Sequence, residues 1–186
     1  MTKLIAFLGM SKPLSTFARD RRGVSAVEFA MILPLMLTLY LGAVEVSQGI
    51  GIDRKVTMTT RTVADLASQV TNITNADMTN MLAASTAVMT PYPTATLQIT
   101  VSSVTIDAQG KATVAWSDTL NGTARGVGSA VTLPSALAIP NSSLIWSEVS
   151  YLYQPVVGYV ITGPLTLSDR MYMRPRLSDK VTRSAS

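Results

Sequence analysis

"RRGVSAVEFAMILPLMLTLYLGAVEVSQ", residues 21–48, joins two arginines to a long apolar run through a single glycine. No side chain between residues 29 and 44 is charged, and two carboxylates, Glu28 and Glu45, flank this run. A helix needs about 20 mainly apolar residues to cross the hydrocarbon core of a bilayer. Residues 24–43 supply them, so this stretch predicts a transmembrane helix.

Positive charge is concentrated before that helix. Of the 15 Lys and Arg side chains, five precede Gly23, and Asp20 alone opposes them. The part after Gly23 has ten cationic and ten anionic side chains, so the net charge of +4 belongs largely to the leader rather than to a nucleic-acid-binding face. Positive charge before a span predicts a cytoplasmic N-terminus. We therefore expect the bulk of the chain to be exported, and we expect no nucleic-acid partner.

The composition also argues against catalysis. The chain contains no Cys and no His, which excludes a disulfide framework, a Cys nucleophile and an imidazole base. The segment RGVGSA, residues 125–130, has two glycines at G-x-G spacing but lacks the third glycine of a dinucleotide-binding loop. No Lys stands at S-x-x-K spacing to activate a Ser. We expect no enzymatic activity, no cofactor, no metal and no small-molecule substrate.

The apolar run has other interpretations. It could be the core helix of a soluble protein, an uncleaved signal anchor or a cleavable signal peptide. A signal peptide has a short apolar stretch of about 7–15 residues before an A-x-A-like site. The best candidate site ends at Ala43, with Leu41 where a small residue is wanted.

Pro34 lies inside the run and predicts a kink, which favours a helix that packs among other helices.

Glu28 stands just inside the apolar run, where a charge is costly. Counting Val24 as position one, Glu28 is the fifth residue and Phe29 the sixth. One interpretation is a carboxylate that stabilises a helix N-terminus through the helix dipole. The other is a mark for a processing enzyme, because a basic leader, a glycine and an apolar helix with Glu at position five are typical of type IV pilin-like proteins.

More narrowly, residues 21–48 resemble the N-terminus of the TadE/TadG-like minor pseudopilins of the tight-adherence (Flp) type IV pilus system. Two stretches in the C-terminal half, SEVSYLYQPVV and LTLSDRMYMRPR, resemble the family less specifically. The matching residues of the N-terminal stretch are Gly23, Ala26, Val27, Glu28, Phe29, Ala30, Pro34, Gly42 and Glu45.

The resemblance implies a non-catalytic minor pseudopilin that takes part in the assembly or priming of such a pilus. It implies cleavage after Gly23 by a prepilin peptidase, with the other pilins and the assembly machinery as partners and the inner membrane as location. Two sets of residues follow from it: Arg22, Gly23, Val24, Glu28 and Phe29 for processing, and Glu28, Pro34 and Glu45 for the membrane and assembly. An uncleaved, signal-anchored periplasmic binding or adaptor protein is the alternative.

The residues around Gly23 and Glu28 are chemically compatible with cleavage after Gly23. Gly23 has no side chain, so a peptidase can approach its backbone closely. Cleavage creates a free amine on Val24, and pairing with this ammonium would offset much of the cost of burying the Glu28 carboxylate in the membrane. For Glu45 two settings remain open: an interfacial charge at the outer headgroup level, or a contact with a partner subunit inside the membrane.

We expect three segments along the chain: a leader at residues 1–23, a transmembrane helix at 24–52 and an exported α+β domain at 53–186. We expect the first helix to continue out of the membrane as an amphipathic helix. A T-x-x-D pattern from Thr74 to Asp77 predicts the start of a second helix, and two prolines, Pro91 and Pro93, end it. Its three methionines, Met78, Met81 and Met89, are expected to be packing residues.

Four segments predict the strands of a small antiparallel sheet with both helices on one face: residues 96–107, 111–119, 143–157 and 164–173. In the first of them the apolar alternation slips at Ser102 and Ser103, as in a β-bulge. In the second, Ala112, Val114 and Trp116 are expected on one face. Residues 134–138 are expected to form a short helix. The basic C-terminal tail is expected to be a solvated, partly disordered end, or a contact for anionic lipid or another subunit.

Overall fold

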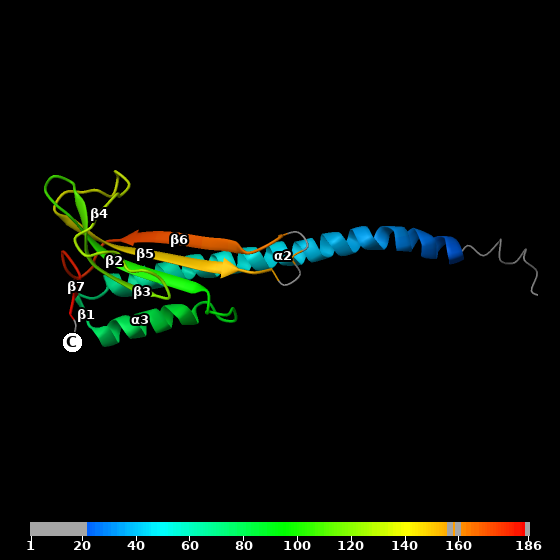
Figure 1. Cartoon of the computed structure of the whole chain (residues 1–186), viewed down its shortest axis with the longest axis horizontal. Helices are drawn as coiled ribbons and strands as arrows, with labels where there is room; N and C mark the ends of the chain where they lie inside the picture. Colours follow the sequence, from blue (N-terminus) through cyan, green and yellow to red (C-terminus); the bar gives the residue numbers. More distant parts are fainter. Residues whose placement is uncertain (1–21, 156–157, 159–160, 185–186) are drawn as a thin grey trace, which may run out of the picture.

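The computed structural model describes residues 22–155, 158 and 161–184, so most of the leader lies outside the described residues. A long helix, α2 (Arg22–Ser68), carries a second helix and two sheets on its C-terminal part (Figure 1). We call residues 72–184 the head. Its elements are β1 (Asn72–Ile73), α3 (Asn75–Ala87), β2 (Leu97–Ile106), β3 (Ala112–Leu120), β4 (Ala130–Val131), β5 (Ser142–Tyr153), β6 (Leu165–Met173) and β7 (Thr182–Arg183).

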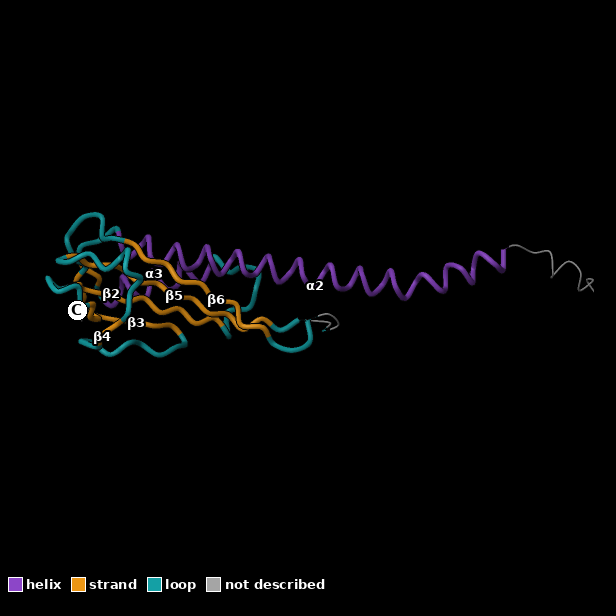
Figure 2. The backbone as a smooth tube through the Cα atoms, turned by 90° about the horizontal axis from the view of Figure 1, so that it is seen from above, coloured by secondary structure: helices purple, strands orange, loops and turns teal. Residues whose placement is uncertain are grey.

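Helix α2 has 47 residues and runs without interruption through Pro34. At about 1.5 Å per residue it is about 70 Å long, more than twice the thickness of a hydrocarbon core. The Pro34 carbonyl accepts a hydrogen bond from the hydroxyl of Thr38 at 2.8 Å. Figure 2 shows a gentle bend in the N-terminal part of the helix rather than a break. The proline is thus accommodated inside a continuous helix.

Helix α3 begins where the T-x-x-D pattern predicts. The Thr74 hydroxyl accepts the Asp77 amide at 3.2 Å, and the Asp77 carboxylate accepts the Thr74 amide at 3.0 Å, so both sides of a capping box are present. The hydrogen bonds that the Thr74 amide and hydroxyl donate to the Asp77 carboxylate lower its pKa below the ordinary value. The helix ends at Ala87, before Pro91 and Pro93.

The main sheet is antiparallel in the order β4-β3-β2-β5-β6, and β1 pairs with β7 in a separate parallel ribbon. Both helices cover one face of the main sheet, with β6 and β5 lying along α2 (Figures 1 and 2). This arrangement confirms the α+β fold with a long N-terminal helix and a second helix packed on a small antiparallel sheet. The expectation that both helices share one face is also confirmed.

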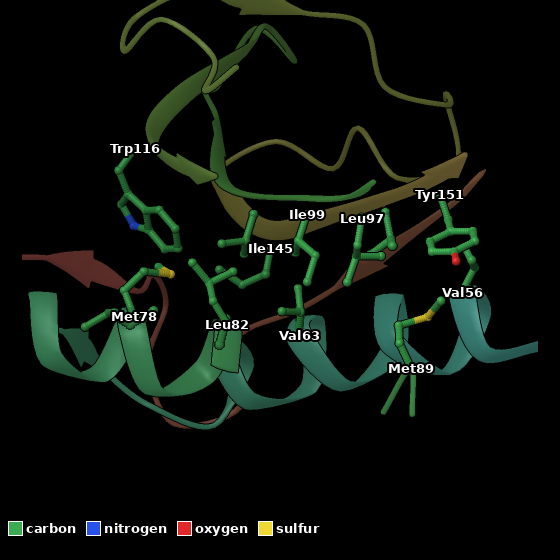
Figure 3. Close-up of a cluster of buried hydrophobic side chains, with 14 of the residues drawn as sticks. Val56, Val63, Met78, Leu82, Met89, Leu97, Ile99, Trp116, Ile145 and Tyr151 are labelled. Atoms are coloured by element: carbon green, nitrogen blue, oxygen red, sulfur yellow. The ribbon is translucent and has the colours of Figure 1, made fainter. Parts of the chain in front are cut away.

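The principal core fills the space between the helices and the sheet (Figure 3). Val56 and Val63 of α2 are at most 1% exposed; in Figure 3 Val63 lies opposite Ile99 of the sheet, and Val56 lies near Tyr151. The expected packing role of the methionines is confirmed, since Met78 and Met89 are buried in this core and Met81 packs against it. Burial of large aliphatic side chains contributes roughly 1.5–3 kcal/mol each, so this core is what attaches the head to α2.

A second, smaller core lies on the other face of the sheet and explains the irregular pattern of β2. Val104 and Ile106 pack there with Leu144 and Trp146, whereas the first half of β2 faces the helices. Strand β2 itself pairs with β5 without a shift, so a bulge in β2 was a wrong prediction. The apolar residues change face because a core exists on each side.

The bulge lies in β3 instead. Ser103 pairs with Trp116 and Val104 with Val114, which leaves Ala115 as the extra residue. Trp116 therefore joins the core on the helix face, while Ala112 joins the core on the outer face. Placing Ala112, Val114 and Trp116 on one face was wrong because an inserted residue reverses the alternation that follows it.

The expected short helix at residues 134–138 is a turn. The Leu137 amide donates to the Pro134 carbonyl at 2.8 Å, and the chain leaves this turn at once. Pro140 cannot donate a backbone hydrogen bond and disfavours helical geometry in the residue before it. Leu133 and Leu137 pack against the outer core, which holds the segment in place without a helix.

The C-terminal segment is docked on the head as far as residue 184, so a solvated, disordered end was a wrong expectation for this part. The Trp116 indole donates to the Val181 carbonyl at 2.8 Å, and Arg183 pairs with Asp118 at 2.9 Å. Arg176 pairs with Asp65 of α2. Two of the tail's cations are thus neutralised within the chain.

Candidate functional site

The first turns of α2 stand free of the head. Val24 is 57% exposed and Phe29 60%, and Glu28 is exposed as well. At Gly23, a Cβ atom would meet no described atom within 4 Å. Helix α2 begins at Arg22, so the expected processing residues all lie in its first two turns. Nothing in the described head shields this backbone from an enzyme.

Within these turns Val24 and Glu28 lie on the same side of the helix. They are four residues apart, and side chains at positions i and i+4 of a helix are neighbours. An amine created on Val24 would therefore be about one helical turn from the Glu28 carboxylate. The helix itself brings the two groups together.

The free part of α2 extends from residue 23 to residue 41. None of these residues is buried, although most are apolar. They span about 28 Å at about 1.5 Å per residue, close to the roughly 30 Å of a hydrocarbon core. Among the described residues α2 is the one helix that is long and apolar enough to cross a membrane, with a window of mean hydropathy 1.9. We call residues 23–41 the bare half of α2.

The packed half, residues 42–68, buries one face against the head. Its buried positions begin with Gly42, Glu45, Gly49 and Ile52, at spacings of three and four residues. Such spacing is that of a helix face in contact with a partner. At Gly49, an added Cβ atom would lie 3.8 Å from the Tyr153 ring, so glycine brings the helix close to the end of β5.

Glu45 lies inside this contact and is 2% exposed. Its carboxylate accepts the Ile161 amide at 3.1 Å, so it binds the segment that joins β5 to β6. Neither of the two expected settings, an exposed headgroup-level charge or a contact with another subunit, includes this bond to its own head. Sequence analysis missed Ile161, and only the row of small residues at Gly42 and Gly49 hinted that this face of the helix is covered.

One tyrosine, Tyr153, lies near this carboxylate. Burial raises the pKa of the Tyr153 phenol, and the negative charge of Glu45 raises it further. Tyr92 is near enough to add to the same effect. An added Cβ atom on Gly51 would lie 3.1 Å from the Tyr92 hydroxyl, so Tyr92 packs close to this helix as well. Because its pKa is raised, the Tyr153 phenol remains neutral at neutral pH.

The remaining carboxylates do not form a site. Asp118 pairs with Arg183, Glu148 pairs with Arg125 at 2.5 Å, and Asp107 accepts two amides of its own turn. Across the described ranges no three carboxylates come close enough together to hold a metal ion.

Comparison with protein families gives a match for α2. Residues 23–65 match the model of a family described as TadE-like protein. The match begins at Gly23 and ends three residues before the end of α2. No curated protein and no solved structure matches the chain. The match confirms the TadE-like resemblance drawn from the sequence: the long N-terminal helix is similar to that of TadE-like proteins.

Proposed function

We propose that this chain is a minor pseudopilin of the tight-adherence pilus system, inserted in the inner membrane with its N-terminus in the cytoplasm. A prepilin peptidase cleaves it after Gly23, and the mature protein takes part in assembling or priming the pilus. The head lies in the periplasm. One observation carries the proposal: the TadE-like match starts at Gly23, the residue from which a bare apolar helix extends for about the thickness of a bilayer.

The accessibility of the first turns supports the cleavage step. A peptidase needs access to the backbone, and Gly23, in the first turn of α2, has no side chain to obstruct the approach. The helix can lose its first residues without loss to the head, because the bare half contributes nothing to the core. Arg21 and Arg22 would hold this bond at the cytoplasmic face by keeping their charges in the headgroup layer.

Glu28 supports the assembly step. In the hydrocarbon core an unpaired carboxylate costs roughly 2.5–3.5 kcal/mol or more on insertion scales. The ammonium of a mature Val24, on the same side of the helix or on a neighbouring subunit, would offset that cost. Before cleavage this ammonium does not exist. Processing and assembly are thereby linked through one charge pair.

The boundary of the membrane segment follows from the packing of α2. Residues 42–52 lie against the head, so a membrane segment that extends to Ile52 would draw part of the head into the bilayer. We propose that the hydrocarbon core covers the bare half and that the periplasmic domain begins at about Gly42. Glu45 then acts within the chain, where it fixes the head to the helix.

The signal-peptide alternative has less support. Cleavage after Ala43 would cut α2 between Gly42 and Glu45, two residues that are buried against the head. The uncleaved signal-anchored adaptor remains the second candidate, because a bare apolar helix followed by a folded head would suit an anchored adaptor equally well. Enzymatic function has no support from the family, which is a structural, pilus-associated one.

Mass measurement of the N-terminal peptide from membrane-extracted protein separates these candidates. We expect a mature chain that begins at Val24. A chain that begins at Met1 or Thr2 would support the uncleaved adaptor, and a start at Val44 would support a secreted domain. Either of these results would remove the proposed cleavage.

Two variants then separate processing from assembly. Gly23→Leu places a branched side chain at the scissile bond, so we expect the protein to stay at precursor length. Glu28→Gln keeps the size and one acceptor oxygen, so we expect mature length but defective assembly, because the Val24 ammonium loses its counter-charge. If Glu28→Gln is cleaved and also assembles normally, the charge-pair account is wrong.

A further inference from the structure

The head has two ends that differ in position relative to the bare half of α2. The end of β5 and the start of β6 lie at the proximal end, where Tyr153 pairs with Leu165 and the Ile161 amide binds Glu45. The distal end lies beside the last turn of α2, where the Arg176 amide donates to the Ser68 carbonyl at 2.9 Å. In Figure 1 the proximal end faces the bare half.

The connecting segments at the two ends differ in charge. At the proximal end, the described residues 88–96, 121–124, 154–155 and 161–164 include no charged side chain. At the distal end, two of the connections, residues 107–111 and 174–180, contain six, while the connection at residues 132–141 contains none. Charged side chains are what a surface in contact with water usually displays, and their absence from the end that faces a membrane segment calls for an explanation.

Tyrosine side chains replace charges at the proximal end. A cavity of about 500 Å³ lies between α2, the segment after α3 and the end of β5, and Tyr92, Tyr151, Tyr153, Gln48 and Gln154 contribute to its walls. A neighbouring cavity of about 380 Å³ shares Tyr92 and Gln48 and adds Tyr40 of the bare half. Neither cavity is lined by a charged residue, whereas the hollow on the outer face of the sheet is lined by Glu148, Asp169 and Arg170.

The position of the smaller cavity matches the depth of a headgroup layer. If the bare half fills the hydrocarbon core, the next turn of α2, about residues 42–45, lies in the interfacial region, which adds about 5–7 Å on each side at about 1.5 Å per residue. Tyr40, Ala43 and Val44 lie at or next to this depth and line the smaller cavity together with Tyr92. Tyrosine is enriched at this depth because its ring is apolar and its hydroxyl can bind water or a headgroup.

We propose that the proximal end of the head is a lipid-binding surface that rests against the headgroup layer of the outer leaflet of the inner membrane, with a phospholipid headgroup in the smaller cavity, between Tyr40 and Tyr92. The phenol and amide groups donate hydrogen bonds to phosphate or ester oxygens, and the lack of charge lets this end enter the interface without desolvating an ion. This inference rests on the proposed function, because it requires α2 to span the membrane.

Depth-dependent fluorescence quenching tests this surface. The full chain, carrying Tyr92→Trp, is reconstituted in phosphatidylcholine vesicles that hold a nitroxide either on the headgroup or deep in the acyl chain. We expect the emission added by this Trp to be quenched at least about two-fold more by the headgroup nitroxide than by the deep one. Tyr172→Trp, on the outer face near the distal end, is the matched control and should respond to neither label.

Two further variants keep the result interpretable. Pro93→Trp places an indole next to Tyr92 in the chain, on the exposed wall of the neighbouring cavity, and should also be quenched by the headgroup nitroxide if Tyr92→Trp disturbs folding. Tyr40→Trp, on the bare half, reports insertion of α2 alone. Quenching of Tyr40→Trp without quenching of Tyr92→Trp and Pro93→Trp would overturn the lipid surface and leave the proposed function intact. An absence of quenching at all three positions would overturn both.

One remaining outcome concerns a second copy of the chain. If neighbouring protein rather than lipid covers the proximal end, Tyr92→Trp emission shifts to shorter wavelength, is not quenched by the headgroup nitroxide and loses this shift on dilution of protein in lipid. That result would overturn the inference as well. The two native tryptophans, Trp116 and Trp146, are buried in the head and supply a constant background that the parent chain measures.

Discussion

The two halves of α2 belong to one continuous helix but differ in what surrounds them. Residues 23–41 expose apolar side chains on every side, and residues 42–68 bury one face and expose another. A helix that is apolar all round needs an apolar solvent, whereas a helix with one covered face needs a partner domain. The difference shows that helix length alone does not tell which part of α2 is covered by the head; the burial pattern does.

Replacing one isoleucine in each half should give the largest difference in the stability of the head. Ile52 is 2% exposed and Ile32 is 52% exposed. Ile52→Ala removes side-chain volume from the core and should lower the free energy of unfolding of the head by about 2–5 kcal/mol. Ile32→Ala should leave it unchanged. Chemical denaturation in detergent, followed by tryptophan emission, measures the free energy of unfolding of both variants. Equal losses of stability would contradict the division of α2 into a packed half and a bare half.

A smaller contrast concerns the two carboxylates. Glu45→Ala removes the acceptor of the Ile161 amide and should cost the head about 1–3 kcal/mol. Glu28→Ala should not affect the head, since the exposed Glu28 lies in the bare half. Glu45→Gln retains an acceptor oxygen and should recover much of the loss. If both alanine variants unfold like the parent, Glu45 does not fix the head to the helix.

The start of α3 supplies the smallest expected effect and a pH dependence. Thr74→Ala removes one side of the capping box and should cost about 1 kcal/mol. Because the pKa of Asp77 is lowered from its ordinary value of 3.8, its contribution is present above that pH and is lost as the pH falls through the folded-state pKa. The parent should therefore lose stability below about pH 4 more steeply than Asp77→Asn does. Parallel curves in acid would contradict this role.

Local sequence signals predicted the elements of this fold well. The apolar run, the capping box and the four long strands depend on residues close together in the chain, and the structure confirms each of them. The family resemblance of residues 21–48 was also readable, because it resides in spacing along one helix. Features that depend on neighbours in sequence are those that a single sequence reveals.

Features that depend on distant segments were missed. The apolar residues in the two halves of β2 pack into different cores, because the turn near Leu137 covers the outer face of the sheet. No local sequence pattern indicates that this face is covered. The tail docks because Asp118 and Trp116 offer partners to Arg183 and Val181 across 65 residues of chain. Glu45 was read as a membrane charge because its partner, a backbone amide at Ile161, leaves no mark in the sequence.

The absence of cysteine from the chain allows the most direct test of the division of α2. Single cysteines replace Ile32 and Leu37 in the bare half and Met58 on the exposed face of the packed half, and a membrane-impermeant maleimide is added to intact proteoliposomes. The account predicts rapid labelling of Met58→Cys from the head side, and no labelling of Ile32→Cys or Leu37→Cys until detergent is added. Labelling of Ile32→Cys as fast as that of Met58→Cys would contradict the claim that the bare half spans the membrane.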